Sequence, residues 1–498
     1  MKLSIPHYSP FWKQRATISL TPWLYDRLPI DLSASPNEQQ ALDELAQVSL
    51  KTVALPNLLL SKIITILRDF GKKKDFESFS KDFFRKLSSR SCVETPRVLG
   101  SCLLPEKKEG EKTISERMAG FGGVAEVVDS FRESGGTVSA ADLLDGIARS
   151  AAASDQFNKN FQVVYSPEVS LAFLAHRFGA SYGAHLRVLT ELKKRIPGFS
   201  PKTVVDYGAG HGVGGLVVNR IWGESLITFV EPSANMSRIG KYMTSDMKGT
   251  WQTALHSGVF DLVLVSYVLL EMRTQDQRDT LIRDLWRKLD INGVLVVIEK
   301  GTPSGFRLIH RVREIFLELS AKSPNFHFVA PCPHESVCPL ALTGRDWCHF
   351  SQPVERIPHE VFSKGAKSQS IDHEKFSYLV IRKGPGPRDK LNSENDAKSA
   401  EDKSFFWPRV VMPPIKASGH TLIDVCASPN SFERLVVNRS KPHGSGYRPS
   451  RDLIWGDLWR YPKRLSRRDA RDYVPENVKG FIARAKKVAD NDDGTSEN

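Results

Sequence analysis

Apolar residues in the N-terminal part of the chain recur every three to four positions, which is the period of an amphipathic helix. Clear examples are ALDELAQVSLKTVALPNLLLSKIITIL and VSLAFLAHRFGASYGAHLRVLTELKKRI. The pattern predicts a mainly helical region over residues 37–195, in which the charged segment KKEGEKT forms a solvated loop.

From Lys202 the pattern changes to short apolar runs, rich in β-branched residues, that are separated by helical stretches. The runs are TVVDYGAG, LITFVEPS, DLVLVSYVLLEM and GVLVVIEKGTP. Strands that alternate with helices form a mostly parallel sheet covered on both faces. The sequence therefore predicts an α/β fold with a Rossmann-type domain at residues 196–325.

The rest of the chain divides by composition. Residues 326–383 and 405–475 combine a cysteine-rich stretch with strand-like runs such as KFSYLVIRKG and HTLIDVC, which predicts a small β-containing domain. Polar residues 384–404, with Gly and Pro at their start, predict a flexible insertion between these two parts. Residues 476–498 form a charged tail, and residues 1–36 suit either a mitochondrial transit segment or a basic N-terminal arm.

Composition limits the class of protein. Hydrophobic residues make up 40% and charged residues 26% of the 498 positions, as in ordinary globular proteins. No apolar run approaches the roughly 18–20 residues of a membrane-spanning helix. Six cysteines are too few for a disulfide scaffold and favour a reducing compartment. The net charge of +13 favours a polyanionic partner such as nucleic acid, although a merely basic globular protein has the same charge.

The segment VVDYGAGHGVGG is the strongest local motif for a nucleotide cofactor. Gly210, Gly212 and Gly215 match the G-x-G-x-x-G pattern of dinucleotide-binding proteins, which is a weak indication when it occurs alone. Two acidic residues distinguish S-adenosylmethionine from NAD as the candidate cofactor. Asp206 ends the first strand and Glu231 ends the second, and an acid at these positions can bind an amino group or a ribose diol.

This pair favours S-adenosylmethionine over NAD, since S-adenosylmethionine has an amino group and no pyrophosphate. The predicted cofactor-binding residues are Asp206, Gly208, Gly210, Gly212 and Glu231.

No catalytic constellation follows from the sequence. After the fourth strand the chain has SYVLLEM, where enzymes that methylate exocyclic amines usually have a polar residue followed by Pro-Pro-aromatic. Methylation of pyrimidine carbon 5 needs a nucleophilic cysteine near this strand, and none is there. Glu271 could act as a base, but a carboxylate that starts a helix is the favoured interpretation. We therefore predict no catalytic residue, and whether the chain is an active methyltransferase stays open.

Four of the six cysteines predict a metal or cluster site. Cys332, Cys338 and Cys348 follow the spacing C-x5-C-x9-C, and Cys426 lies downstream. Zinc ribbons usually contain C-x2-C pairs, whereas open spacing next to prolines is more typical of iron–sulfur ligation. Zinc and four unligated buried thiols stay open as alternatives. His334 and His349 are interpreted as bystanders, and Cys92 and Cys102 as structural thiols.

Several segments together resemble one known family. VVDYGAGHG, VEPS, SYVLLEM, APCPHESVCPL, DWCHFSQPVER, KFSYLVIRKG and HTLIDVC are similar to the methyltransferase-like family of mitochondrial small-ribosomal-subunit proteins and assembly factors, over about residues 160–460. The resemblance implies a Rossmann-type S-adenosylmethionine methyltransferase domain and a 4Fe-4S cluster held by Cys332, Cys338, Cys348 and Cys426. It also implies association with small-subunit rRNA and with ribosomal proteins or assembly factors in the mitochondrial matrix.

The basic residues near the C-terminus suit such an RNA partner. Cations can pair with phosphates while aromatic rings stack on bases, and here the cations lie beside Trp459 and Tyr461. A solvated basic surface would contain the same residues. The predicted RNA-binding residues are Arg460, Lys463, Arg464, Arg467 and Arg468.

Overall fold

The computed structural model describes residues 36–68, 73–88, 163–320, 325–343, 346–357, 370–390, 397, 399–428, 431–439 and 446–461. The predicted transit segment before Pro36, the KKEGEKT loop and the charged tail 476–498 lie outside these described residues.

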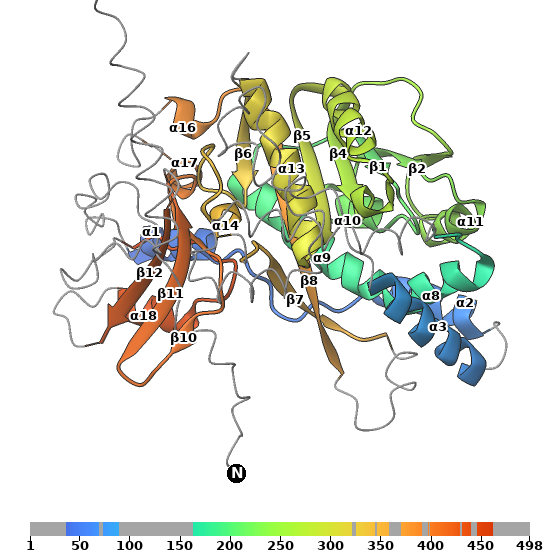
Figure 1. The fold of residues 1–498 in the computed structure, drawn as a ribbon, viewed down its shortest axis with the longest axis horizontal. Coiled ribbons are helices and arrows are strands. Elements are labelled where there is room, and N and C mark those ends of the chain that lie inside the picture. The colour runs from blue at the N-terminus through green and yellow to red at the C-terminus, as the bar shows by residue number, and fades with distance from the viewer. Residues whose placement is uncertain are drawn as a thin grey trace, which may run out of the picture.

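An eight-stranded sheet forms the centre of the larger part of the molecule (Figure 1). Its strands are β1 (Thr203–Tyr207), β2 (Leu226–Val230), β3 (Gly249–Gln252), β4 (Phe260–Ser266), β5 (Leu289–Lys300), β6 (Phe326–Ala330), β7 (Phe350–Glu355) and β8 (Ile371–Lys383). The order is β3-β2-β1-β4-β5-β8-β6, and β7 pairs with β8. Strands β1 to β5 are parallel, whereas β8 runs antiparallel to β5, β6 and β7. The predicted α/β, Rossmann-type fold is confirmed.

Helices cover both faces of this sheet, as the alternating pattern requires. The helices are α8 (Pro167–His176), α9 (Phe178–Arg195), α10 (Val213–Trp222), α11 (Ala234–Met243), α12 (Gln275–Arg287) and α13 (Pro303–Ser320). On one face Val204 and Leu264 share a core with Val188 of α9 and Val217 of α10. On the other face, odd-numbered positions such as Val205 pack with α12 and α13. Successive side chains of one strand thus enter opposite cores.

The region predicted as helical contains a break. Helices α1 (Pro36–Ala46), α2 (Asn57–Arg68) and α3 (Lys73–Ser88) are present, but residues 47–56 between α1 and α2 are not helical. There Val53 forms a parallel bridge with Val354 of β7. Pro56 disfavours helical backbone in the residue before it, which separates α2 from the preceding segment. A backbone partner at β7 then fixes the extended conformation.

A second, four-stranded antiparallel sheet follows in the chain (Figure 1). It contains β9 (Arg409–Val410), β10 (Ile415–Lys416), β11 (His420–Ala427) and β12 (Ser431–Asn438), in the order β10-β11-β12 with β9 beside β11. The short helices α14 (Pro339–Leu342) and α18 (Tyr447–Asp452) contact β12.

Two predicted boundaries differ from the structure. The Rossmann-type sheet does not end at residue 325, because β6, β7 and β8 from the predicted cysteine-rich part belong to the same sheet. The predicted flexible insertion 384–404 contains α16 (Pro387–Lys390) and α17 (Ala400–Ser404). Arg388 fixes α16 by donating hydrogen bonds to the carbonyls of Phe328 and Phe405, both at 2.7 Å. The polar composition of residues 384–404 gave no indication of these tertiary contacts.

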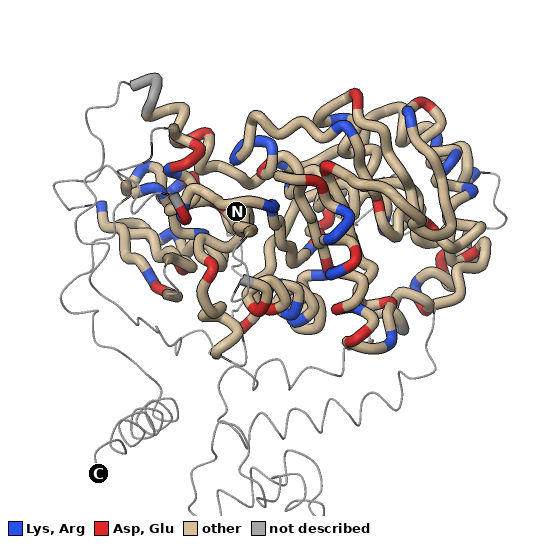
Figure 2. The backbone as a smooth tube through the Cα atoms, turned by 90° about the horizontal axis from the view of Figure 1, so that it is seen from above, with Lys and Arg blue, Asp and Glu red and all other residues tan. Residues whose placement is uncertain are grey.

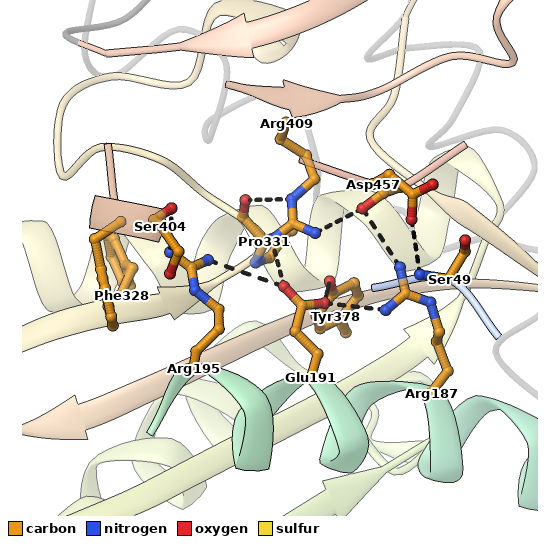
Figure 3. A network of polar contacts seen from close by, with 12 residues as sticks. Ser49, Arg187, Glu191, Arg195, Phe328, Pro331, Tyr378, Ser404, Arg409 and Asp457 are labelled. Atoms are coloured by element: carbon orange, nitrogen blue, oxygen red, sulfur yellow. Dashed lines mark hydrogen bonds and ion pairs between the residues drawn. The ribbon is translucent and has the colours of Figure 1, made fainter. Parts of the chain in front are cut away.

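A buried polar network joins α9 to the small sheet (Figure 3). Glu191 of α9 pairs with Arg409 of β9 and accepts a hydrogen bond from the Tyr378 hydroxyl at 2.7 Å. Arg187 and Arg195, one turn away on either side, also lie within ion-pairing distance of Glu191. Ser49 donates its backbone N–H to Asp457 at 2.8 Å, which attaches the N-terminal extended segment to the same region.

Basic and acidic residues are interspersed along the described backbone rather than sorted into separate stretches (Figure 2). In the part of the chain that the structure describes, no helix has the length and hydropathy needed to cross a membrane.

Candidate cofactor pocket and cysteine cavity

A pocket of about 630 Å³ opens at the carboxyl ends of β1, β2, β4 and β5. This is the edge at which open parallel sheets bind their ligands. Four of the five predicted cofactor residues line the pocket: Asp206, Gly208, Gly210 and Glu231. Gly212 does not line it.

Asp206 is the most deeply placed acid of the predicted set. Its side chain is buried, and Oδ2 accepts a hydrogen bond from the Gly215 backbone N–H at 3.0 Å. Burial raises the pKa of Asp206 to about 7, although the Gly215 bond opposes this shift. The nearby carboxylate of Glu231 raises this pKa further. A cationic ligand would be attracted to this carboxyl group.

The glycine turn brings backbone close to this acid. Gly208, Gly210 and Gly212 have φ values of 71°, 54° and 78°, in the left-handed region that favours glycine. A Cβ atom on Gly208 would lie 2.3 Å from Cγ2 of Val268, so a larger residue would displace the loop after β4. Gly212 forms the N-cap of α10 instead of contacting the pocket.

Glu231 organises the loop that covers the second strand. Its two carboxylate oxygens accept backbone N–H groups from Gly210 and Ser233, both at 2.8 Å. Burial raises the pKa of Glu231, and the two N–H bonds oppose the shift. Nε2 of His211, a residue that also lines the pocket, is buried without a hydrogen-bond partner in the described structure.

The far side of the pocket carries polar residues that the sequence analysis missed. His185 of α9 lies with Nδ1 at 2.7 Å from the Ser181 carbonyl and Nε2 at 2.8 Å from the Ser266 hydroxyl. Since a carbonyl only accepts, Nδ1 donates and Nε2 accepts from Ser266. Burial lowers the pKa of His185 to about 4, which keeps the ring neutral. Helical spacing places His185 on the sheet face, but only the fold brings it to Ser266.

Tyr267, directly after β4, belongs to a second polar group at the pocket. Its hydroxyl donates to Glu374 at 3.2 Å, and Arg177 makes two hydrogen bonds to the same carboxylate, at 2.6 and 2.8 Å. The φ of Tyr267 is 61°, which is unusual for a bulky residue. Tyr267 is thus held in a strained conformation where the pocket needs the chain to turn.

Glu299, at the end of β5, is a further pocket residue that the sequence analysis missed. It accepts the Leu269 backbone N–H at 2.8 Å, and burial raises its pKa to about 7. An acid at the end of the predicted strand GVLVVIEK was the available signal. Glu271, considered above as a base, lies in a short 3-10 turn (Leu269–Glu271) and lines the pocket. Among the described residues that line the pocket there is no cysteine, so a cysteine nucleophile is not placed there.

The four predicted ligand cysteines line one small cavity between the two sheets, with a volume of about 40 Å³. Cys332 follows β6, Cys338 caps α14, Cys348 precedes β7, and Cys426 lies in β11. All four are free thiols. Chain segments almost a hundred residues apart therefore meet at this cavity.

Burial raises the pKa of the thiols of Cys338, Cys348 and Cys426, and the neighbouring cysteines raise it further. Burial thus favours the protonated form of these three thiols, and a metal would have to displace their protons. Within the described part of the chain, no three His, Cys, Asp or Glu side chains are grouped as a metal ion requires. A zinc ion draws its ligands to about 2.0–2.3 Å from one point. The four thiols surround the cavity instead of converging on one point.

The two histidines interpreted as bystanders differ in position. His349 stacks on Trp347 and does not line the cavity. His334 lines it, with Nε2 at 3.5 Å from Sγ of Cys426.

Arg460 is the one predicted RNA-binding residue that the structure describes. Its guanidinium donates to Asp43 at 2.7 Å, stacks on Tyr461 and is 6% exposed. These contacts hold Arg460 inside the molecule. The other four, Lys463, Arg464, Arg467 and Arg468, lie outside the described residues.

Comparison with known proteins identifies a family. The model of the family described as "Mitochondrial small ribosomal subunit Rsm22" matches residues 167–460. The ribosome assembly protein METTL17, mitochondrial, of Homo sapiens is 29% identical over 60% of this chain and 64% of its own length. The ribosome assembly protein RSM22, mitochondrial, of Saccharomyces cerevisiae is 24% identical over 58% of this chain and 66% of its own length. The chain thus spans less than two thirds of either relative.

Comparison with solved structures gives weak likenesses over less than half of the chain. A putative RNA methyltransferase from Pyrococcus horikoshii is 14% identical, covers 40% of this chain and 83% of its own, and gives a TM-score of 0.26. The plantazolicin methyltransferase BpumL in complex with SAH is 11% identical, covers 48% and 91%, and gives 0.27. The fold is defined by the strand order described above, not by these likenesses.

Proposed function

Because the chain belongs to the family of mitochondrial small ribosomal subunit Rsm22 proteins, we propose that it assembles or forms part of the mitochondrial small subunit. In this proposal it works in the mitochondrial matrix and binds small-subunit rRNA through its methyltransferase-like domain. An iron–sulfur cluster at the four cysteines completes the RNA-binding form. The matched relatives are named as mitochondrial ribosome assembly proteins, which supports the proposal.

The observation that carries the proposal is the convergence of Cys332, Cys338, Cys348 and Cys426 on one cavity. A 4Fe-4S cluster takes four cysteine thiolates and spaces them farther apart than one ion does. The cysteines come from both sheets, so a cluster would tie the small sheet to the large domain. Metal-binding free energy would then add to folding free energy.

The test uses full-length protein purified without oxygen. We expect brown absorbance, with iron and sulfide in equal amounts, and co-sedimentation with the mitochondrial small subunit or its precursor. Cys426→Ser should lose the absorbance and the association together, whereas Cys102→Ser, outside the proposed ligand set, should keep both. A folded, cluster-free Cys426→Ser protein that still associates would contradict the role of the cluster. Zinc in place of iron would support the alternative of a zinc-containing RNA-binding protein.

The pocket supports a second candidate, an active rRNA methyltransferase that uses S-adenosylmethionine. Asp206, Glu231, the glycine turn and the unpartnered Nε2 of His211 are groups that could hold its amino and ribose groups. When bound, that cofactor supplies an electrophilic methyl group. His185 and Tyr267 would then position the acceptor rather than deprotonate it, because their polar atoms are already hydrogen-bonded.

Asp206→Ala separates the two candidates. An enzyme would lose one mapped rRNA methyl group while the protein still binds the subunit. An unchanged methylation map would contradict catalysis and leave the assembly role in place.

A further inference from the structure

Arg313 of α13 is a buried cation that has no carboxylate partner among the described residues, and it lines the cysteine cavity. Its Nη2 donates to the backbone carbonyls of His334 and Ser336, and its guanidinium stacks on Phe328 with 5.0 Å to the ring centre. Its Nε and Nη1 atoms are buried without any hydrogen-bond partner in the described structure. The contacts of Nη2 and the stacking on Phe328 therefore fix the cation in place, while the three N–H bonds of Nε and Nη1 have no partner among the described residues.

The other arginine of the cavity has a carboxylate partner. Arg409 pairs with Glu191 and also donates to the carbonyl of Pro331 at 3.0 Å. No aspartate or glutamate is among the described residues that line the cavity. Without a lining carboxylate Arg313 has no counter-ion there, which is costly for a buried charge. Among the described residues the cavity therefore carries more positive than negative charge, which an anionic occupant would balance.

His334 presents a second donor to the same space. The Ser336 backbone N–H donates to Nδ1 of His334 at 3.2 Å, so Nδ1 is unprotonated. The proton of the neutral ring is then on Nε2, which lies 3.5 Å from Sγ of Cys426. An N–H group aimed at sulfur is a hydrogen-bond donor to a thiolate and not a metal ligand.

We infer that Arg313 supplies a counter-charge, and His334 an N–H···S hydrogen bond, to a net-negative metal–thiolate centre at the four cysteines, and that both residues tune that centre. The inference rests on the proposed function, because it assumes a metal centre in the cavity. Four thiolates exceed the positive charge of a 4Fe-4S core or of a zinc ion, so either occupant is anionic. Reduction of a cluster adds one more negative charge, which a buried cation and an N–H···S bond stabilise.

The test compares full-length wild type with Arg313→Gln, Arg313→Lys and His334→Phe, all purified without oxygen. The measurement is the midpoint potential of the cluster, from a redox titration followed by electron paramagnetic resonance. We expect Arg313→Gln and His334→Phe to shift the potential to more negative values and Arg313→Lys to shift it less than Arg313→Gln. The matched control is Arg311→Gln on the same helix, because Arg311 pairs with Asp279 and does not line the cavity.

A purely structural role for Arg313 is distinguished by thermal unfolding of the same protein with and without its metal. A counter-charge predicts that Arg313→Gln lowers the melting temperature of the loaded protein more than that of the metal-free protein. Equal losses in both states, with an unchanged potential, would overturn the inference while the proposed cluster stands. If the wild type holds zinc, competition with a chelator replaces the redox titration as the measurement. Equal zinc affinities of wild type and Arg313→Gln would then overturn the inference. A wild type that binds no metal at these cysteines would overturn the proposed function itself.

Discussion

Arg409 of β9 and Glu191 of α9 form an ion pair in which the side chains are 1% and 0% exposed (Figure 3). The pair connects the small antiparallel sheet to the helix that also carries His185 at the cofactor pocket. Because Arg409 donates to Pro331, next to Cys332, the same contact reaches the cysteine cavity. The buried carboxylate of Glu191 thus lies between the cofactor pocket and the cysteine cavity.

Removing one member of this pair should strongly destabilise the protein. Arg409→Met leaves Glu191 buried without its closest cation, and breaking such pairs typically costs about 3–5 kcal/mol of unfolding free energy. Urea denaturation measures the loss. Arg287→Met is the control, since its pair with Asp284 is largely exposed and should contribute under about 1 kcal/mol. Similar losses in both variants would contradict the importance of the buried pair.

Glu191 should also make stability depend on pH in the acid range. Burial alone would raise its pKa, but Arg409, Arg187 and Arg195 outweigh burial and lower the pKa to about 2. A carboxyl with a depressed folded pKa stabilises the fold above its unfolded pKa, about 4.5, and loses that contribution as pH falls toward about 2. The stability of Glu191→Gln, measured by thermal unfolding, should therefore change less than that of wild type over this range. Parallel pH curves would contradict this prediction.

Asp206 should have the opposite linkage. Its pKa is raised to about 7 by burial, so the folded protein binds a proton that the unfolded chain releases near its usual pKa of about 4. Stability of the ligand-free protein should then fall as pH rises from about 4 through about 7. Asp206→Asn should stabilise the ligand-free protein at neutral pH, on the order of 2 kcal/mol, while weakening S-adenosylmethionine binding. Calorimetry measures both the stability and the S-adenosylmethionine affinity of the variant. An Asp206→Asn protein that binds S-adenosylmethionine as tightly as wild type would show that Asp206 does not belong to the binding site.

Gly215 should tolerate no side chain. A Cβ atom there would lie 2.3 Å from Cε1 of Phe229 and 3.2 Å from Ile227, where α10 approaches β2. Gly215→Ala should cost about 1–3 kcal/mol through overpacking, measured as a lower denaturation midpoint. Gly198→Ala serves as the control, since nothing lies within 4 Å of the added methyl group. Equal midpoints would show that the helix can move away from the strand at little cost.

Local pattern predicted the parts of the fold that depend on neighbouring residues. The strands β1, β2, β4 and β5 overlap the predicted runs, because a strand buried on both faces must be apolar along most of its length. Asp206 and Glu231 follow such strands, so their arrival at one pocket could be expected from a parallel sheet. The strands β3, β6 and β7 were not predicted, since polar residues interrupt their sequences GTWQ, FHFVA and FSQPVE.

Contacts between segments that are far apart in the sequence were not predicted. Nothing local in KFSYLVIRKG indicates that β8 inserts between β5 and β6 and so extends the sheet past the expected boundary. His185 reaches Ser266 only after α9 packs on the sheet. Arg460 was expected at an RNA surface, but it lies against Asp43 from the other end of the chain.

The sequence alone determined that this chain contains a doubly covered α/β sheet with acids at the ends of its first two strands, because periodicity and the position of an acid at a strand end are set within a few residues. It also singled out the four cysteines. Only the tertiary structure decided that these thiols surround one space beside an uncompensated Arg313, with Glu191 nearby bound to three arginines. The physical reason is that burial and charge compensation depend on which segments meet, and no stretch of sequence contains that information by itself.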